Sequence, residues 1–197
     1  MTNQTRINYN FYYWGPLLLK TKLSSSDLAA CTKLCSKNSK FVNDKLAGVI
    51  KHEHSINSGE YSKIIKPYLE CLRESFKQWY GKPLDKKITM HVAWVNYMGP
   101  GEFNPPHIHT SCDFSSVLIV KSTEKLKEEY KKFTGVGGGP GSIAFTYGET
   151  QPHSISSKEF FPEEGDLFIF PATLVHFVYP FMCKEERITI SANFILQ

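Results

Sequence analysis

The sequence lacks the paired cysteines that a disulfide-stabilised fold requires. Its five cysteines are an odd number without a Cys-X-X-Cys motif: Cys31, Cys35, Cys71, Cys112 and Cys183. No apolar run approaches the roughly 20 residues of a membrane span. No basic segment followed by an apolar run stands at the N-terminus. These absences predict a cytoplasmic protein, held in a reducing compartment and without a membrane contact.

The sequence also has little excess of charge. Its 23 Lys and Arg residues against 19 Asp and Glu residues give a net charge of +4, too small to indicate nucleic-acid binding. The lysine-rich stretch 121–132 is interpreted as a solvated face. The glycines of residues 135–141 lack the Lys-Ser/Thr ending of a phosphate-binding loop, so a mobile loop is expected there.

Helical signals are found in the first half of the chain. The run Ser24–Asp27 is rich in N-cap residues and precedes apolar residues at helical spacing. A longer helix is predicted from about Gly59 to Tyr80, where seven apolar residues share one stripe: Ile64, Ile65, Tyr68, Leu69, Leu72, Phe76 and Trp79. Gly81 is expected to end this helix, and Pro67 either kinks it or marks its start.

From residue 88 onward the apolar period changes to two, which indicates strands. Six strands are predicted: Ile88–Tyr97, Phe114–Lys121, Ser142–Tyr147, Asp166–Phe170, Val175–Tyr179 and Ile188–Ile195. Helices followed by short strands predict an α+β fold, in which a closed or jelly-roll sheet is buttressed by N-terminal helices. We expect a single domain over residues 1–197, with residues 1–87 as mainly helical support and residues 88–197 as the β-barrel core.

Three histidines are candidate metal ligands. His107 and His109 alternate on an extended segment, so both side chains point the same way and can bind one metal ion. His176 follows an apolar strand that ends at Pro171 and, taken alone, would be interpreted as a core histidine. With the two-histidine pair about 70 residues upstream, it becomes the natural third ligand. Three histidines leave open the coordination positions that an oxygen-activating iron requires.

The last predicted strand alternates polar and apolar residues. Arg187, Thr189, Ser191 and Asn193 fall on one face, which would point into a polar cavity. An arginine inside a barrel is costly without an anionic partner. Arg187, assisted by the hydroxyl of Thr189, is suited to bind a carboxylate with two hydrogen bonds. A structural salt bridge is the alternative interpretation.

Together these motifs resemble the 2-oxoglutarate/Fe(II)-dependent dioxygenases. The order is a His-X-His pair, a Pro-ended strand with a distal histidine, and Arg-X-Thr about ten residues later. The segments Asn96–Gly101, Phe160–Phe181 and Glu186–Phe194 are similar to the prolyl-hydroxylase-like branch, with its small phage-encoded and marine bacterial members. The resemblance covers roughly residues 90–197.

The resemblance implies a double-stranded β-helix, a jelly-roll or cupin-like barrel, with iron at its open end. It implies a hydroxylase that uses Fe(II) and the co-substrate 2-oxoglutarate. His107 would be the first ligand and His176 the distal one, while Arg187, Thr189 and Tyr97 would bind 2-oxoglutarate. His109 departs from the family, which mostly has Asp or Glu there. The substrate is either a small molecule or a peptidyl residue; no nucleic-acid partner is expected, and the sequence leaves the oligomeric state open.

A cupin is the strongest rival interpretation. The spacing of Gly101, His107, His109 and Asp113 nearly reproduces the first cupin motif, with Asp in place of Glu. His176 would complete a four-ligand site that works without 2-oxoglutarate, as a dioxygenase, an isomerase or a binding module. That reading gives no reason for Arg187 and Thr189, and Asp113 is equally explained as a solvent-facing acid. A non-catalytic barrel used for recognition is a third possibility.

Overall fold

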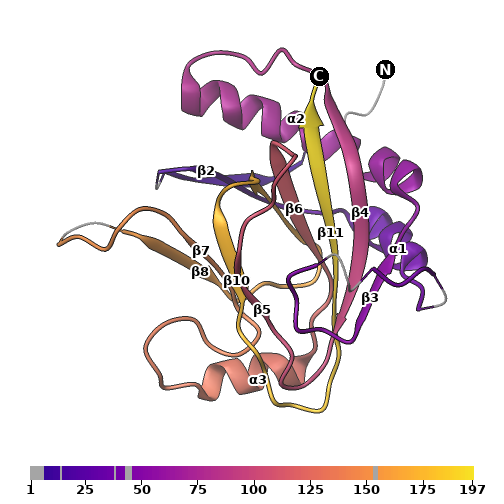
Figure 1. Ribbon diagram of the computed structural model, residues 1–197, viewed down its shortest axis with the longest axis vertical. Helices are drawn as coiled ribbons and strands as arrows, with labels where there is room; N and C mark the ends of the chain where they lie inside the picture. The colour runs from indigo at the N-terminus through magenta and orange to yellow at the C-terminus, as the bar shows by residue number, and fades with distance from the viewer. Residues whose placement is uncertain (1–6, 14, 38, 43–45, 153–154) are drawn as a thin grey trace.

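The computed structural model describes residues 7–13, 15–37, 39–42, 46–152 and 155–197 (Figure 1). A larger antiparallel sheet has the strand order β1-β2-β9-β6-β11-β4-β3, and a smaller one has the order β5-β10-β7-β8. The larger sheet consists of β1 (Tyr9–Tyr13), β2 (Leu17–Lys22), β9 (Asp166–Pro171), β6 (Phe114–Lys121), β11 (Arg187–Leu196), β4 (Ile88–Met98) and β3 (His52–Ser55). The smaller sheet consists of β5 (Asn104–His107), β10 (Val175–Val178), β7 (Ile143–Thr146) and β8 (Ser157–Phe160). The helices are α1 (Ser25–Leu34), α2 (Ser58–Tyr80) and α3 (Glu124–Lys132).

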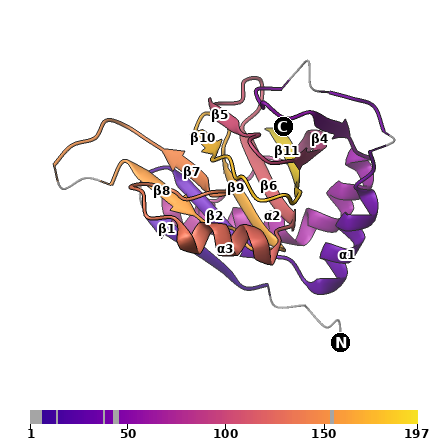
Figure 2. The same cartoon turned by 90° about the horizontal axis from the view of Figure 1, so that it is seen from below.

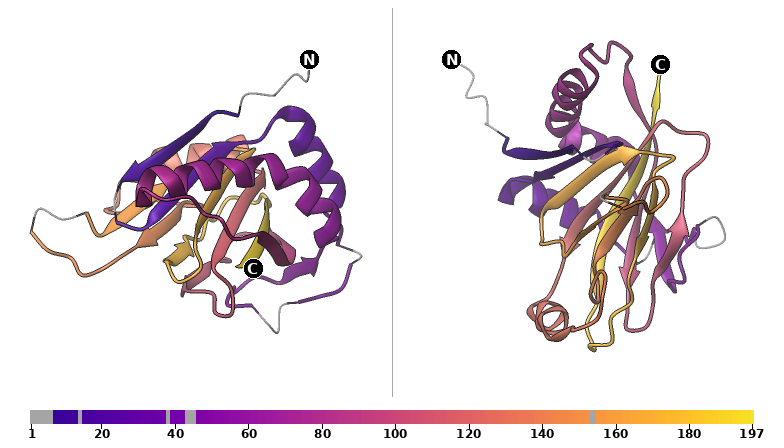
Figure 3. Two further views of the ribbon diagram at one scale, coloured as in Figure 1. Left: turned by 90° about the horizontal axis from the view of Figure 1, so that it is seen from above. Right: turned by 90° about the vertical axis from the view of Figure 1, so that its left-hand side faces the viewer.

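The larger sheet has a different core on each of its faces. On one face α1 and α2 pack against it (Figure 3). Tyr61 and Ile65 of α2 belong to the same apolar cluster as Val95 of β4. On the other face lies the smaller sheet (Figure 2). There Phe168 of β9 packs with Phe145 of β7. The predicted α+β jelly-roll architecture is confirmed.

Helix α2 lies close to its predicted range. Asn57 caps its start by accepting a hydrogen bond from the Glu60 backbone N–H, and Gly81 ends it in the left-handed conformation, with φ of 69°. Pro67 lies inside the helix rather than at its start. Among the described residues, no helix is both long and apolar enough to cross a membrane.

Several elements escaped prediction. The first 87 residues contribute β1, β2 and β3 to the larger sheet in addition to two helices. Strand β3 is the polar sequence His-Glu-His-Ser, which has no apolar alternation to reveal it. The lysine-rich stretch forms α3, capped by Thr123, which accepts from the Leu126 backbone N–H. Its exposed lysines agree with a solvated face, but Leu126 is buried and anchors the helix.

The glycine-rich segment 135–141 is a loop, as expected, but its second half is packed against the fold while residues 135–137 are exposed. Gly138, Gly139 and Gly141 are buried. A Cβ on Gly138 would lie 2.5 Å from Cε2 of Tyr179, and one on Gly141 would lie 2.9 Å from Cδ1 of Leu126. The glycines are there because two side chains occupy the space that a Cβ would need.

Replacing Gly141 with alanine is expected to lower the free energy of unfolding by about 1–3 kcal/mol, as overpacking does. The new Cβ would meet Leu126, and the backbone φ of +74° adds strain. Urea unfolding measures the change. Gly59→Ala is the control, because Gly59 has open space apart from Asn57 at 3.4 Å. Equal stability of the two variants would contradict the prediction.

Candidate metal centre

Strand pairing brings His107 and His176 together. The two residues face each other in the antiparallel register of β5 and β10, and their ring centroids are 4.2 Å apart. A tight turn precedes β10, with the Leu174 N–H donating to the Pro171 carbonyl at 2.9 Å. The register of β5 and β10 therefore brings the two histidines together, although they are far apart in the sequence.

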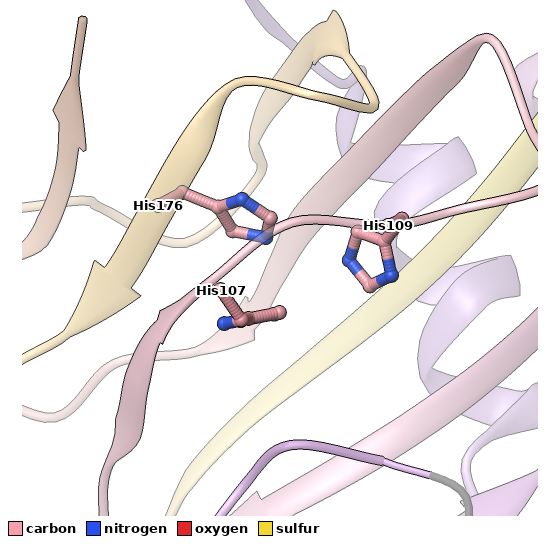
Figure 4. Close-up of side chains that lie close together, drawn as sticks. All are labelled: His107, His109 and His176. Carbon is pink, nitrogen blue, oxygen red and sulfur yellow. The ribbon is translucent and has the colours of Figure 1, made fainter.

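His109 joins the pair from the segment that follows β5 (Figure 4). Its backbone N–H donates to the Ala172 carbonyl at 2.8 Å, which ties this segment to the turn before β10. One ring nitrogen of each of the three histidines lies within 4.8 Å of the others. Among the described residues this is the one cluster of three or more His, Cys, Asp or Glu side chains with such spacing. The structure thus brings together all three predicted ligands.

Hydrogen bonds orient two of the rings. Nδ1 of His107 lies 2.7 Å from the Pro105 carbonyl, and Nδ1 of His176 lies 2.9 Å from the Leu174 carbonyl. A carbonyl only accepts, so each Nδ1 carries the proton and each Nε2 keeps its lone pair for a metal ion. Imidazole nitrogens suit iron, nickel and zinc, so the donor set fits an oxygen-activating iron with positions left open.

Burial keeps the three rings neutral. Desolvation, followed by the proximity of His107, lowers the pKa of His109 to about 4 and that of His176 to about 3. Desolvation also lowers the pKa of His107, against the Pro105 hydrogen bond, which raises it. At neutral pH the cluster is therefore already in the form that binds a metal ion.

Acidification is expected to destabilise the metal-free protein through this cluster. An unfolded histidine has a pKa of about 6.5, so the unfolded chain takes up more protons than the folded one as the pH falls below that value. The stability that the neutral histidines contribute is therefore fully present above pH 6.5. It is lost as the pH falls toward about 4, the pKa of His109 in the folded protein. Between pH 7 and 5, wild type should lose on the order of 1 kcal/mol more than His109→Gln in urea unfolding. Equal losses would contradict this.

Arg187 lies in a cavity next to the three histidines. The cavity is about 40 Å³ in volume and is also lined by Thr189, Ser191 and Asn96. Arg187 is 2% exposed, and its Nε and Nη2 atoms have no hydrogen-bond partner among the described residues. Burial lowers its pKa to about 10, so the guanidinium remains charged at neutral pH. The structural salt bridge considered from the sequence is absent from the ion pairs of the described residues.

Asn96 organises the hydroxyl groups beside Arg187. Its Nδ2 atom donates to Oγ1 of Thr189 and to Oγ of Ser191, both at 3.1 Å. Each hydroxyl accepts this bond and keeps its own proton for an acceptor in the cavity. Asn96 was missed as a site residue, although its alternation with Tyr97 on the predicted strand was the available signal. Glu53 on β3, also on the cavity wall, gave no such signal.

Two residues considered from the sequence lie elsewhere. Tyr97 points to the helix side of β4, where His54 packs edge-on against it and the Lys37 ammonium lies 4.7 Å from its ring centroid. The structure does not bring Tyr97 to the cavity of Arg187. Asp113 is exposed and accepts the Leu196 backbone N–H at 2.8 Å, so the four-ligand cupin site does not form.

A wider cleft of about 420 Å³ opens beside the histidines. Trp94, His107 and His109 line both this outer cleft and the inner cavity. A register shift between β4 and β11 pairs Asn193 with Val92 but Phe194 with Met90. The extra residue is His91, which lines the cleft together with Val92. Such bulges re-aim side chains beside active sites.

Comparisons with solved structures support the fold. A prolyl-4-hydroxylase of Pseudomonas putida is 15% identical, with a TM-score of 0.59 over 91% of this chain and 92% of that one. A prolyl hydroxylase of Trichoplax adhaerens, in complex with a hypoxia inducible factor peptide, is 14% identical, with a TM-score of 0.55 over 90% and 83% of the chains. HygX of Streptomyces hygroscopicus, with nickel, 2-oxoglutarate and hygromycin B bound, is 6% identical, with a TM-score of 0.53 over 90% and 82%.

The family comparison concerns the sequence itself. No curated protein matches the chain. A family model described as "Putative 2OG-Fe(II) oxygenase" matches residues 92–193, more than half of the 197 residues. The matched range contains the three clustered histidines and Arg187. The chain therefore belongs to the 2OG-Fe(II) oxygenase family of oxidoreductases.

Proposed function

We propose that this protein is an Fe(II)- and 2-oxoglutarate-dependent hydroxylase. His107, His109 and His176 would hold the iron, and Arg187 with Thr189 would bind the far carboxylate of 2-oxoglutarate. One oxygen atom of O2 would enter succinate as 2-oxoglutarate loses CO2, and the other would form a hydroxyl group on the substrate. The bound iron supplies this oxygen activation.

The observation that carries the proposal is the buried guanidinium of Arg187. A charge that is 2% exposed, with two nitrogens lacking acceptors among the described residues, needs an anion to offset its desolvation. A carboxylate can accept two hydrogen bonds from a guanidinium, which matches these free donors. The hydroxyl of Thr189, oriented by Asn96, adds a third donor.

The surrounding residues would position the reactants and exclude water. The inner cavity is narrow, so a bound carboxylate would contact its walls directly. The outer cleft would present the substrate to the metal, because His107 and His109 line both spaces. The structural neighbours bind a peptide in one case and hygromycin B in another. A peptidyl residue and a small molecule therefore both remain candidate substrates.

The test uses the iron-loaded protein without an added substrate. With no substrate to accept the second oxygen atom, an added reductant such as ascorbate supplies the electrons that return the iron to Fe(II). Some 2-oxoglutarate should then be converted to succinate, with matching oxygen uptake. We expect succinate to depend on both iron and 2-oxoglutarate. If the iron-loaded protein neither binds 2-oxoglutarate nor forms succinate, the proposal is wrong. Oxygen uptake without 2-oxoglutarate would instead favour the cupin-type reaction.

A further inference from the structure

Glu53 is a buried acid on the wall of the proposed co-substrate cavity. It pairs with Asn96 in the register of β3 and β4, so its side chain lies next to the row formed by Asn96 and Thr189. The residue is 1% exposed, and it lines the same cavity as His107 and Arg187.

The chain makes room for this carboxylate at Gly48. A Cβ on Gly48 would lie 3.0 Å from Oε1 of Glu53 and 2.5 Å from Oδ1 of Asn104. Both oxygens therefore approach the same backbone position, which any larger residue would block. Asn104 begins β5, the strand that ends at His107. Glu53 therefore lies near the start of the strand that carries the first metal ligand.

The net charge of the occupied site gives a reason for a carboxylate at this position, provided that the proposed function holds. Iron brings two positive charges and Arg187 brings one, while three neutral imidazoles bring none. The 2-oxoglutarate dianion supplies only two negative charges. One positive charge would remain in a buried site, where uncompensated charge is expensive.

We infer that Glu53 supplies the negative charge that a three-histidine ligand set lacks, and that it does so from the cavity wall rather than by binding the metal. In this role Glu53 does not bind the metal ion and acts on the site through its negative charge. The negative charge of Glu53 favours binding of the metal ion and disfavours binding of the 2-oxoglutarate dianion. Its removal should therefore weaken metal binding and strengthen 2-oxoglutarate binding.

Without the metal, burial and the nearby carboxylate of Glu102 raise the pKa of Glu53 to about 7. Arg187 and the neutral histidines are the other titratable groups on this cavity wall. A bound dication would favour the ionised form of Glu53. A group with a pKa of about 7 is half ionised at pH 7, so metal binding at that pH should release up to about half a proton from Glu53. The ligands themselves should release few, because the pKa values of His109 and His176 are about 4 and about 3.

The experiment compares wild type with Glu53→Gln, which keeps the size of the side chain and removes its charge. Nickel(II), which suits imidazole ligands, is titrated by calorimetry at pH 7 in two buffers of different ionisation enthalpy. 2-Oxoglutarate is then titrated into the nickel-loaded protein. Glu53→Asp keeps the charge, and Glu128→Gln removes one charge at an exposed position of α3 that does not line the cavity.

Glu53→Gln should bind nickel about tenfold more weakly, as loss of an outer-shell partner does, and should lose most of the proton release. It should bind 2-oxoglutarate roughly threefold more tightly or better, because a like charge is gone. Glu53→Asp should keep the proton release, and Glu128→Gln should match wild type. Unchanged affinities, or a loss of both, would overturn the inference, since damage to the fold weakens both. Failure of wild type to bind nickel or 2-oxoglutarate would instead refute the proposed function.

Discussion

Nickel-loaded Arg187→Met protein is expected to bind 2-oxoglutarate at least about 30-fold more weakly than wild type. Truncating one partner of a buried, hydrogen-bonded charge pair costs about 2–5 kcal/mol. Here the far carboxylate would be left in a cavity that still offers the hydroxyls of Thr189 and Ser191 but no other Lys or Arg side chain among its described lining residues. Calorimetry of 2-oxoglutarate binding measures the loss, and succinate formation by the iron-loaded variant should fall with it.

The same substitution should stabilise the protein that holds no ligand. Arg187 has two nitrogens without acceptors among the described residues, and its burial lowers its pKa to about 10. Replacing such a charge with an apolar side chain of similar length is commonly neutral or stabilising, by about 1–4 kcal/mol. Arg73→Met is the control, because Arg73 is on α2 and donates to backbone carbonyls of Leu84 and Lys86. Unchanged 2-oxoglutarate affinity in Arg187→Met would show that another group binds the carboxylate.

Six strands of the second half could be predicted because they alternate or run apolar, whereas β5, β8 and α3 were not predicted. Strand β6 has its predicted bounds, and β4, β9, β10 and β11 begin or end within a residue or so of them. The candidate ligands followed from the same pattern. Side chains that alternate on a strand share a face, which placed His107 with His109 and Arg187 with Thr189.

The remainder depends on pairings that the local sequence does not encode. Strand β3 is recognisable only beside β4, and that pairing alone carries Glu53 to the cavity wall and buries His54 on the opposite face. Tyr97 lies ten residues before His107, but alternation turns it to the helix side while Asn96 faces the cavity. His91 faces the outer cleft only because a bulge changes the phase of β4. Each of these positions results from long-range register.

Removing the ring of His176 is expected to abolish most metal binding. His176 is 4% exposed, and its Nδ1 proton is held by the Leu174 carbonyl, which fixes Nε2 toward the other two histidines. His176→Ala would leave two of the three nitrogens, and we expect nickel affinity to fall at least about 100-fold, beyond the loss typical of outer-shell changes. Nickel should then no longer raise the melting temperature, because a ligand stabilises the folded state only when its concentration exceeds its Kd.

A cavity left by the alanine could destabilise the fold by itself, since the His176 ring packs against Phe145 and Phe170. His176→Phe therefore serves as a companion variant, because it keeps an aromatic ring in that space without a metal-binding nitrogen. Both variants should lose the nickel-dependent rise in melting temperature, while Asp113→Ala should keep it, because Asp113 bonds the Leu196 backbone outside the cluster. If Asp113→Ala lost the metal and His176→Phe kept it, the metal would be bound by a different set of ligands. The opposite result ties the metal to the strand pairing of β5 and β10, which places His176 against His107.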